Sequence, residues 1–282
     1  MSASSTKEES KSTTNAVVAM HWFRKGLRLH DNPGLLHALS LARDGPDGDG
    51  DGGGRIYPVY VVDPNCYQLM KCSANRARFL LECVRDLDGS LRERGSRLYV
   101  VVGDPVEVLP GLWDEWGVTH LTHEADETGE PYAACRDEAV RRAGLEAGVE
   151  VTDFLSETLR PLGNVTGGYV ANVGGLASNA PSTMSSFQQL LSRIDRGNIP
   201  SPLDAPNEID FPGGCDADYD DKYLPLENPW DIPWPRGFDR NEIGPVWNRE
   251  ECLDASLSPI AKGGETIALR RLHLTVTARP DW

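Results

Sequence analysis

Three short stretches of the chain are apolar at consecutive positions, so both faces of each would be buried if it formed a strand. Unbroken apolar runs of this length are typical of strands in a parallel sheet, where helices cover both faces. Two further predicted strands contain more polar residues. Together the five predicted strands cover residues 17–23, 56–62, 98–102, 119–123 and 150–154.

Segments with a helical spacing of apolar residues separate these strands. Asp31-Asn32-Pro33 supplies an N-cap and a proline for the first turn of one helix. Gly103-Asp104-Pro105 forms a turn that starts another helix. Further helices are predicted at residues 74–94 and 131–147. Because strands alternate with helices, we predict an α/β fold with a five-stranded, parallel, doubly wound sheet of the Rossmann-like or flavodoxin-like kind.

The pattern changes after residue 159. Residues 161–260 are rich in Gly, Asn, Ser and Pro, and are expected to form a connector with one or two helices, the clearest at residues 183–194. Such long connectors usually link two modules or lie over them. We expect the tryptophans of the connector to be packing anchors. A new helical pattern over residues 261–282 predicts the beginning of an all-helical domain.

The composition is that of a soluble globular protein, with 39% hydrophobic residues and a net charge of −15. This acidic surplus makes DNA binding by the segment alone unexpected, because nucleic-acid binders usually carry a basic surplus. No apolar run approaches the roughly 18 residues that a membrane span needs. Residues 1–16 predict a disordered tail without a secretory signal or a clear transit peptide. The expected location is the nucleus or cytoplasm. The absence of a clear transit peptide counts against a plastid location but does not exclude it.

Several local patterns resemble functional motifs but fail on their context. The Asp-Gly alternation at residues 47–52 resembles a calcium loop, yet Pro58 stands where a bidentate glutamate is required. The sequence contains no P-loop and no G-x-G-x-x-G motif. His120 and His123 have opposite parity on a predicted strand, so a metal pair is not expected. We predict no metal site and no catalytic residue in this chain.

Charged residues follow the predicted strands, at the edge of a parallel sheet where ligands bind. They are Arg24, Asp63, Gly103-Asp104 and residues 124–130. Lys25 and Arg28 lie close to Arg24 in sequence. These basic groups could hold an anionic ligand, pair with acids of another domain, or only pin the first helix by salt bridges. The spacing alone leaves these alternatives open.

Motifs in order from about residue 17 to residue 282 resemble those of the photolyase/cryptochrome family. The resemblance is closest to (6-4) photolyases and animal-type cryptochromes. The motifs are residues 21–33 (HWFRKGLRLHDNP), Asp63-Pro64, residues 75–81, Gly103-Asp104-Pro105, residues 124–126, residues 130–132, Arg136-Asp137 and residues 263–269 (GGETIAL).

The resemblance implies that residues 17–160 form an antenna domain, which carries a folate or deazaflavin chromophore. A carboxy-terminal helical domain would hold FAD, and residues 261–282 would be its truncated start, so we expect the FAD site to be absent and the chain alone to be non-catalytic. The full-length protein would act on UV-damaged DNA or signal to proteins under blue light. By motif position, the candidate antenna-binding residues are Arg24, Asp63, Arg76, Asp126 and Glu130.

Two departures from the family pattern affect this assignment. Residues 127–129 are extra, so either Glu127 or Glu130 could take one role, and Glu157 stands where the family usually has histidine. Two rival hypotheses are a naturally truncated cryptochrome that acts as a protein-interaction module, and an unrelated nucleotide-binding α/β domain. A transcript that continues past Trp282 would favour a fragment of a full-length photolyase or cryptochrome over a natural truncation.

Overall fold

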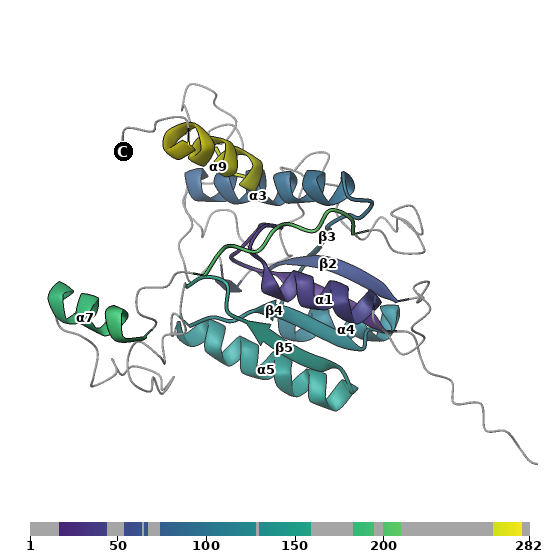
Figure 1. The fold of residues 1–282 in the computed structure, drawn as a ribbon. Coiled ribbons are helices and arrows are strands. Elements are labelled where there is room, and N and C mark those ends of the chain that lie inside the picture. Colours follow the sequence, from purple (N-terminus) through teal and green to yellow (C-terminus); the bar gives the residue numbers. More distant parts are fainter. Residues whose placement is uncertain are drawn as a thin grey trace, which may run out of the picture.

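A computed structural model describes residues 17–43, 54–63, 65–66, 74–127, 130–158, 183–194, 200–209 and 262–277. Within these ranges five strands form one parallel sheet in the order β3-β2-β1-β4-β5 (Figure 1). The strands are β1 (Val18–Phe23), β2 (Arg55–Val62), β3 (Tyr99–Val102), β4 (His120–Glu124) and β5 (Glu150–Phe154). This is the Rossmann-like order, with a topological switch point between β1 and β4. The predicted five-stranded parallel sheet is confirmed.

Helices cover both faces of the sheet (Figure 1). The helices between strands are α1 (Pro33–Arg43), α3 (Ala74–Arg92), α4 (Pro105–Trp116) and α5 (Pro131–Ala147). Later helical segments are α7 (Met184–Ile194), α9 (Glu265–Leu272) and the π-helical turn η3 (His273–Thr277). No helix in the described ranges is long and apolar enough to cross a membrane. The calcium-like loop and the tryptophans Trp230, Trp234 and Trp247 lie outside the described residues.

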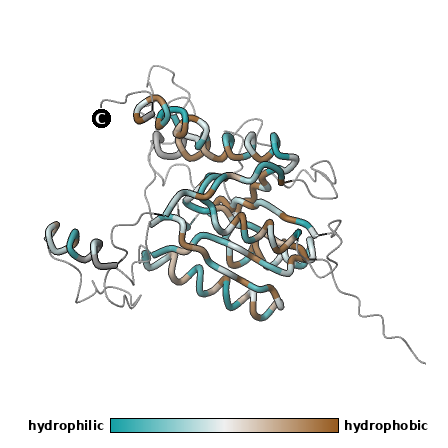
Figure 2. Tube along the Cα trace, viewed as in Figure 1, coloured by the Kyte–Doolittle hydropathy of each residue, from teal (hydrophilic) through white to brown (hydrophobic). Residues whose placement is uncertain are grey.

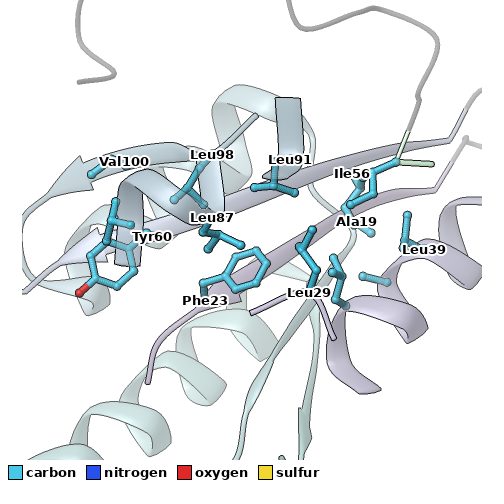
Figure 3. Packing of buried hydrophobic residues seen from close by; sticks show 14 of the residues in the cluster. Ala19, Phe23, Leu29, Leu39, Ile56, Tyr60, Leu87, Leu91, Leu98 and Val100 are labelled. Carbon is cyan, nitrogen blue, oxygen red and sulfur yellow. The ribbon is translucent and has the colours of Figure 1, made fainter. Parts of the chain in front are cut away.

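Side chains of β1 alternate between two cores, as the pleat of a strand requires. Ala19 and Phe23 belong to the core that also contains α1 and α3, whereas Met20 and Trp22 belong to the core that also contains α4 and α5. Figure 3 shows Phe23 and Leu87 of α3 close together in the first core. Hydrophobic and hydrophilic positions alternate along α1 and α4, and the buried apolar residues of these helices belong to the two cores on the sheet (Figure 2).

Residues 200–209 form an extended strap that completes the first core. Ile209 is fully buried in that core, and its N–H donates to the carbonyl of Arg94 at 2.9 Å. Near the other end, Asp31 and Leu203 are joined by two hydrogen bonds, of 2.8 and 3.2 Å. Asp31 has a φ of +53°, a left-handed conformation that aspartate tolerates better than most residues. The strap therefore joins the turn before α1 to the end of α3.

The N-cap of α1 fixes the protonation of the buried His21. Leu35 N donates to Asn32 Oδ1 at 2.9 Å, so Asn32 is the N-cap and its Nδ2 faces His21 Nε2 at 3.1 Å. Because Nδ2 can only donate, His21 Nε2 accepts, and His21 Nδ1 donates to Thr122 Oγ1 at 2.8 Å. Burial, with a smaller effect of the nearby His123, lowers the pKa of His21 to about 3.

This lowered pKa makes the fold sensitive to acid. In the unfolded chain the pKa of histidine is about 6.5, so between about pH 6.5 and 3 the unfolded state binds more protons than the folded state. The contribution of His21 to stability is complete above about pH 6.5 and decreases as the pH falls toward 3.

We predict that Asn32→Asp weakens this loss of stability in acid. Aspartate keeps the capping oxygen but replaces the amide donor with a carboxylate beside His21 Nε2, which raises the pKa of His21. Urea unfolding at pH 7 and pH 4.5 should show a smaller fall in unfolding free energy for the variant than for the wild type. Asn207→Asp, at an exposed position of the strap, is the matched control. An unchanged pH dependence in Asn32→Asp would contradict the assignment to His21.

Candidate functional site

A cavity of about 1100 Å³ lies beyond the carboxyl ends of β1 and β2, beside the switch point. Its lining comes from β1 and the turn after it, the end of β2, Asp126 after β4, the start of α5, one face of α3, Pro202 of the strap, and α9. The lining contains aromatic and aliphatic side chains as well as charged ones. The apolar members include Trp22, Phe23, Leu27, Tyr60, Phe79, Leu80, Ala133, Leu269 and Leu272.

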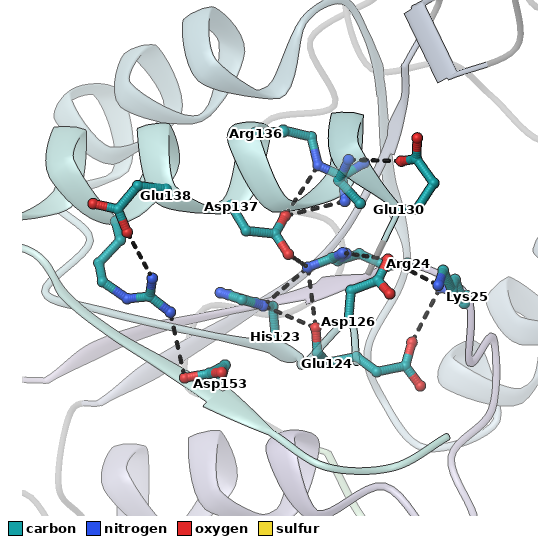
Figure 4. A network of polar contacts seen from close by, with 12 residues as sticks. Arg24, Lys25, His123, Glu124, Asp126, Glu130, Arg136, Asp137, Glu138 and Asp153 are labelled. Carbon is teal, nitrogen blue, oxygen red and sulfur yellow. Dashed lines mark hydrogen bonds and ion pairs between the residues drawn. The ribbon is translucent and has the colours of Figure 1, made fainter. Parts of the chain in front are cut away.

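Arg24 lies at the centre of a buried polar network at this edge (Figure 4). Its Nη1 donates to Asp137 Oδ2 at 2.8 Å and to the carbonyl of Glu124 at 3.0 Å, and Nη2 lies 3.9 Å from Asp126 Oδ2. The same Nη1 is 3.2 Å from His123 Nδ1. Burial, and then the charge of Arg24, lower the pKa of His123, so its imidazole stays neutral at physiological pH. The arginine thus joins the end of β1 to β4 and α5.

Arg136 carries the network from Arg24 to the end of β2. It donates to Asp137 Oδ1 from Nε and Nη2, each at 3.1 Å, and its Nη1 is 3.5 Å from Asp63 Oδ2. Burial alone lowers the pKa of Arg136, but Asp137 and Asp63 outweigh it and hold the pKa above its ordinary value. Tyr132 donates its hydroxyl proton to Asp63 Oδ2 at 2.6 Å, and burial together with this bond raises the pKa of Tyr132.

The indole of Trp22 packs against both arginines. The guanidinium carbons of Arg24 and Arg136 lie 5.0 and 5.2 Å from its ring centroid, within the range of cation–π interactions. Arg136 also lies over the ring of Tyr132 at 5.6 Å. Stacking on these rings fixes the planes of the guanidinium groups in addition to their hydrogen bonds.

Lys25 extends the charged network toward solvent. Its Nζ lies 2.8 Å from Asp126 Oδ2 and 3.5 Å from Glu157 Oε2. The glutamate that replaces the family's usual histidine therefore gives Lys25 a second acidic partner. Burial raises the pKa of Glu157, Lys25 opposes that shift, and the neighbouring Glu124 and Asp126 add to it.

Glu124 shapes the turn after β1. Its Oε2 accepts from the backbone N–H groups of Lys25 and Gly26 at 3.1 and 2.8 Å, and Oε1 accepts from Ser156. A Cβ on Gly26 would lie 2.5 Å from Glu124 Oε1, so only glycine allows this approach.

Four of the five candidate residues predicted from the sequence line the cavity: Arg24, Asp63, Asp126 and Glu130. The side chain of the fifth, Arg76 at the start of α3, lies outside the described residues. Glu130 is the N-cap of α5, where its two oxygens accept from Tyr132 N at 3.1 Å and Ala133 N at 2.7 Å.

Other expected positions lie elsewhere. Asp104 caps α4 by accepting from Val106 N at 2.9 Å, and it is not part of the cavity wall. Glu127, the alternative to Glu130, accepts from Thr158 Oγ1 at 3.0 Å. One alternative was that the arginines only pin the first helix by salt bridges. For Arg24 this is wrong, because the described contacts of Arg24 are with α5 and the end of β4 and not with α1. The described residues hold no group of three or more metal-ligating side chains.

Tyr132 and Arg136 were not among the candidates, although both line the cavity. A signal for them is present in the sequence. Pro131 marks the first turn of the helix that follows the strand at residues 119–123, and residues four apart on a helix share a face. Tyr132 and Arg136 satisfy that spacing.

We predict that Asp137→Asn destabilises the fold by about 3 kcal/mol, because it removes the charge that two buried guanidinium groups share. The side chains of Arg24 and Arg136 are only 5% and 9% exposed, so water cannot replace the carboxylate. Urea unfolding at neutral pH measures the change. The neighbouring Glu138→Gln is the control: its pair with Arg141 is exposed, and the loss should be below about 1 kcal/mol. Equal losses in both variants would contradict the importance of burial.

Comparisons with known proteins place the chain in one family. Residues 19–174 match the family model described as DNA photolyase. Cryptochrome-1 of Rattus norvegicus is 37% identical over 266 residues, covering 91% of this chain and 37% of that protein. Cryptochrome-2 of Gallus gallus is 34% identical over 257 residues, covering 90% of this chain and 37% of that protein. The chain thus spans a little over a third of the length of these curated relatives.

Solved structures agree with the fold. The cryptochrome of Synechocystis sp. PCC6803 aligns with a TM-score of 0.64 and 22% identity, over 91% of this chain and 45% of that one. A class III photolyase of Agrobacterium tumefaciens aligns with a TM-score of 0.63 and 23% identity, over 94% of this chain and 45% of that one. With its ordered motifs, its Rossmann-like sheet and these relatives, the chain belongs to the photolyase/cryptochrome family.

Proposed function

We propose that this chain is the antenna-bearing amino-terminal part of a blue-light FAD flavoprotein, either a (6-4) photolyase or an animal-like cryptochrome. In this proposal the cavity beside the switch point holds a folate or deazaflavin chromophore. The observation that carries it is the cavity itself, which at about 1100 Å³ is large enough for a fused heteroaromatic ring and its substituent. Arg24, Asp63, Asp126 and Glu130 are its proposed polar contacts, and Arg76 is included by its motif position.

The apolar part of the lining supports a planar ligand. Tyr60 comes from β2, Phe79 and Leu80 come from α3, and Leu269 and Leu272 come from α9. Side chains of this kind bind a ring through its faces, while a few polar groups at its edge fix the orientation.

The charge balance of the lining favours a ligand without phosphate. Among the described residues of the lining, each Arg and Lys already has a carboxylate partner at 2.8 to 3.6 Å. These residues are Arg24, Lys25, Arg28 and Arg136, and the lining carboxylates outnumber them: Asp31, Asp63, Asp126, Glu130 and Glu265. A phosphate ester would meet excess negative charge and compete with existing ion pairs. The described residues therefore fit a pterin or deazaflavin ring better than a dinucleotide.

FAD is typical of the family, and we assign it to a helical domain of the full-length protein instead of this cavity. There the flavin would supply light-driven electron transfer to a DNA photoproduct, or a redox change that drives signalling. The partners of the full-length protein would accordingly be UV-damaged DNA or signalling proteins. The role of the present chain would be to hold the antenna at a fixed position relative to that domain.

Chromophore retention tests the antenna proposal. The chain is incubated with methenyltetrahydrofolate or with an 8-hydroxy-5-deazaflavin, and the absorbance band that remains after gel filtration is measured. We expect the wild type to retain one of them. Ala268→Trp should lower affinity at least about tenfold, because its indole would occupy space that the ligand needs. Ala268 is exposed and lines the cavity from α9, so the fold should tolerate the change.

Ala134→Trp is the matched control, since Ala134 is an exposed helical alanine outside the cavity lining. Retention of neither probe by the wild type would refute the proposal. If Ala268→Trp blocks binding while Asp126→Asn and Glu130→Gln bind as the wild type does, the cavity stands and the residue assignments fail.

Riboflavin and FMN test the inference about charge, because they differ only by a phosphate. We expect FMN to displace the bound chromophore about tenfold less effectively than riboflavin at low ionic strength. The difference should shrink in high salt, which screens the excess negative charge. Stronger displacement by FMN would show that a cation in the site is available to a phosphate.

A second function, protein interaction by a naturally short cryptochrome, is favoured by exposed apolar side chains at the end of the described chain. Leu269, Leu272, Leu274 and Val276 are 43% to 61% exposed. Sequencing the transcript beyond the codon for Trp282 separates the two functions. An open reading frame that continues supports the first, and a stop codon supports the second.

A further inference from the structure

The cavity is closed on one side by a helix from a distant part of the sequence. Residues 264–272 contribute Gly264, Glu265, Ala268, Leu269 and Leu272 to its lining. The rest of the wall comes from residues before 137 and from Pro202. Helix α9 lies along α3, which also lines the cavity (Figure 1). The shape of the cavity therefore depends on how α9 is docked.

One side chain joins α9 to the turn that follows β1. Glu265 Oε2 accepts from Leu29 N, and Glu265 Oε1 accepts from His30 N, each at 2.8 Å. Both oxygens of the carboxylate are used, and hydrogen bonds to a charged acceptor are stronger than those between neutral groups. The N–H group of Leu29 is held in position for its bond, because the Leu29 side chain is buried and fixes its own backbone.

Two carboxylates of α3 bind the backbone at the start of α9. Glu82 Oε2 accepts from Gly263 N at 2.7 Å, and Asp86 Oδ2 accepts from Thr266 N at 3.0 Å. Helix α9 has no side-chain cap of its own, so Asp86 acts as its cap from another helix. A Cβ on Gly264, which has a φ of +118°, would lie 2.7 Å from Asp86 Cγ. Glycine permits both this conformation and this approach.

Apolar burial contributes little to the docking of α9. No residue of the helix itself is buried in the described structure. Its attachment depends on backbone N–H groups held by Glu265, Glu82 and Asp86. Segments with few buried apolar contacts open locally at low free energy, well before the core unfolds. Docked and undocked positions of α9 are therefore separated by less free energy than the folded and unfolded states of the sheet.

We propose that Glu265 is the positioning residue that docks α9 over the cavity, so that a ligand in the cavity and the docked position of α9 stabilise each other. The second half of this statement rests on the proposed antenna function. A ligand that touches Ala268, Leu269 and Leu272 binds the docked position more tightly than the undocked one. By linkage, it shifts the population toward docking by the same factor by which docking raises its affinity.

This coupling gives the occupied cavity an effect on the chain that follows. Helix α9 continues directly into η3, where Leu274 and Val276 are exposed. The docked position of α9 therefore also sets the position of these two apolar side chains. A ligand in the cavity thereby biases the position of η3 and of its exposed side chains Leu274 and Val276.

Hydrogen exchange of the full chain without ligand tests the docking role of Glu265. Glu265→Asp keeps the charge but shortens the side chain by one methylene, so the carboxylate no longer reaches both N–H groups. We expect the amides of Leu29, His30 and α9 to exchange at least about tenfold faster than in the wild type. Glu107→Asp is the matched control, because Glu107 is exposed in the first turn of α4. It should leave those amides unchanged.

Two outcomes would overturn the docking role. One is unchanged exchange of the Leu29 and His30 amides in Glu265→Asp. The other is an equal acceleration in β1 and β4, which would mean that the residue supports the whole fold. Glu265→Gln is a second variant: its amide can accept only one of the two bonds, so we expect an intermediate exchange rate.

The coupling has its own test with methenyltetrahydrofolate and the 8-hydroxy-5-deazaflavin. A bound probe should slow exchange in α9 of the wild type, and Glu265→Asp should lower its affinity about tenfold. Equal affinity for both proteins would overturn the coupling while the antenna proposal stands. If the wild type binds neither probe, the antenna proposal fails and the coupling with it, whereas the ligand-free exchange rates still decide the docking role.

Discussion

The carboxylate of Asp137 is shared by two buried arginines, and the ligand-facing edge of the sheet depends on it. Arg24 comes from the end of β1 and Arg136 from α5, so the shared acid fixes the helix against the central strand. Arg136 then reaches Asp63 at the end of β2. Charges this far from water are stable only when each is paired and hydrogen-bonded. The edge is consequently a rigid electrostatic frame.

The frame explains the character of the cavity beside it. The cations beside the cavity are already neutralised by carboxylates. Shape and apolar contact are therefore the main contributions to the binding free energy of a ligand. Trp22 contacts both guanidinium groups and is almost fully buried, so the wall behind the cavity cannot easily rearrange. The wall formed by α9 is different, because polar contacts with the backbone hold it and no residue of the helix is buried. One cavity thus combines a fixed side with an adjustable side.

The sequence was sufficient for the sheet because its strands are encoded locally. Unbroken apolar runs in β1, β2 and β3, and caps such as Asn32 and Asp104, predicted elements whose ends agree with the structure to within two residues where a range was given. Strand ends also indicated Arg24, Asp63 and Asp126, since the topology of a parallel sheet brings such positions to one edge. What the sequence did not reveal depends on long-range contacts. Nothing local shows that Glu265 meets Leu29, or that Arg24 meets Asp137.

The strap of residues 200–209 has a consequence for how the protein is made. All five strands are complete at Phe154, yet Ile209 is a fully buried member of the core between the sheet and α3. During synthesis the strands and their helices leave the ribosome well before Ile209 does. The core under α1 and α3 therefore keeps part of its apolar surface exposed until the strap emerges, while all members of the core under α4 and α5 have already been made. The position of Ile209 in the sequence thus delays the completion of one core relative to the other.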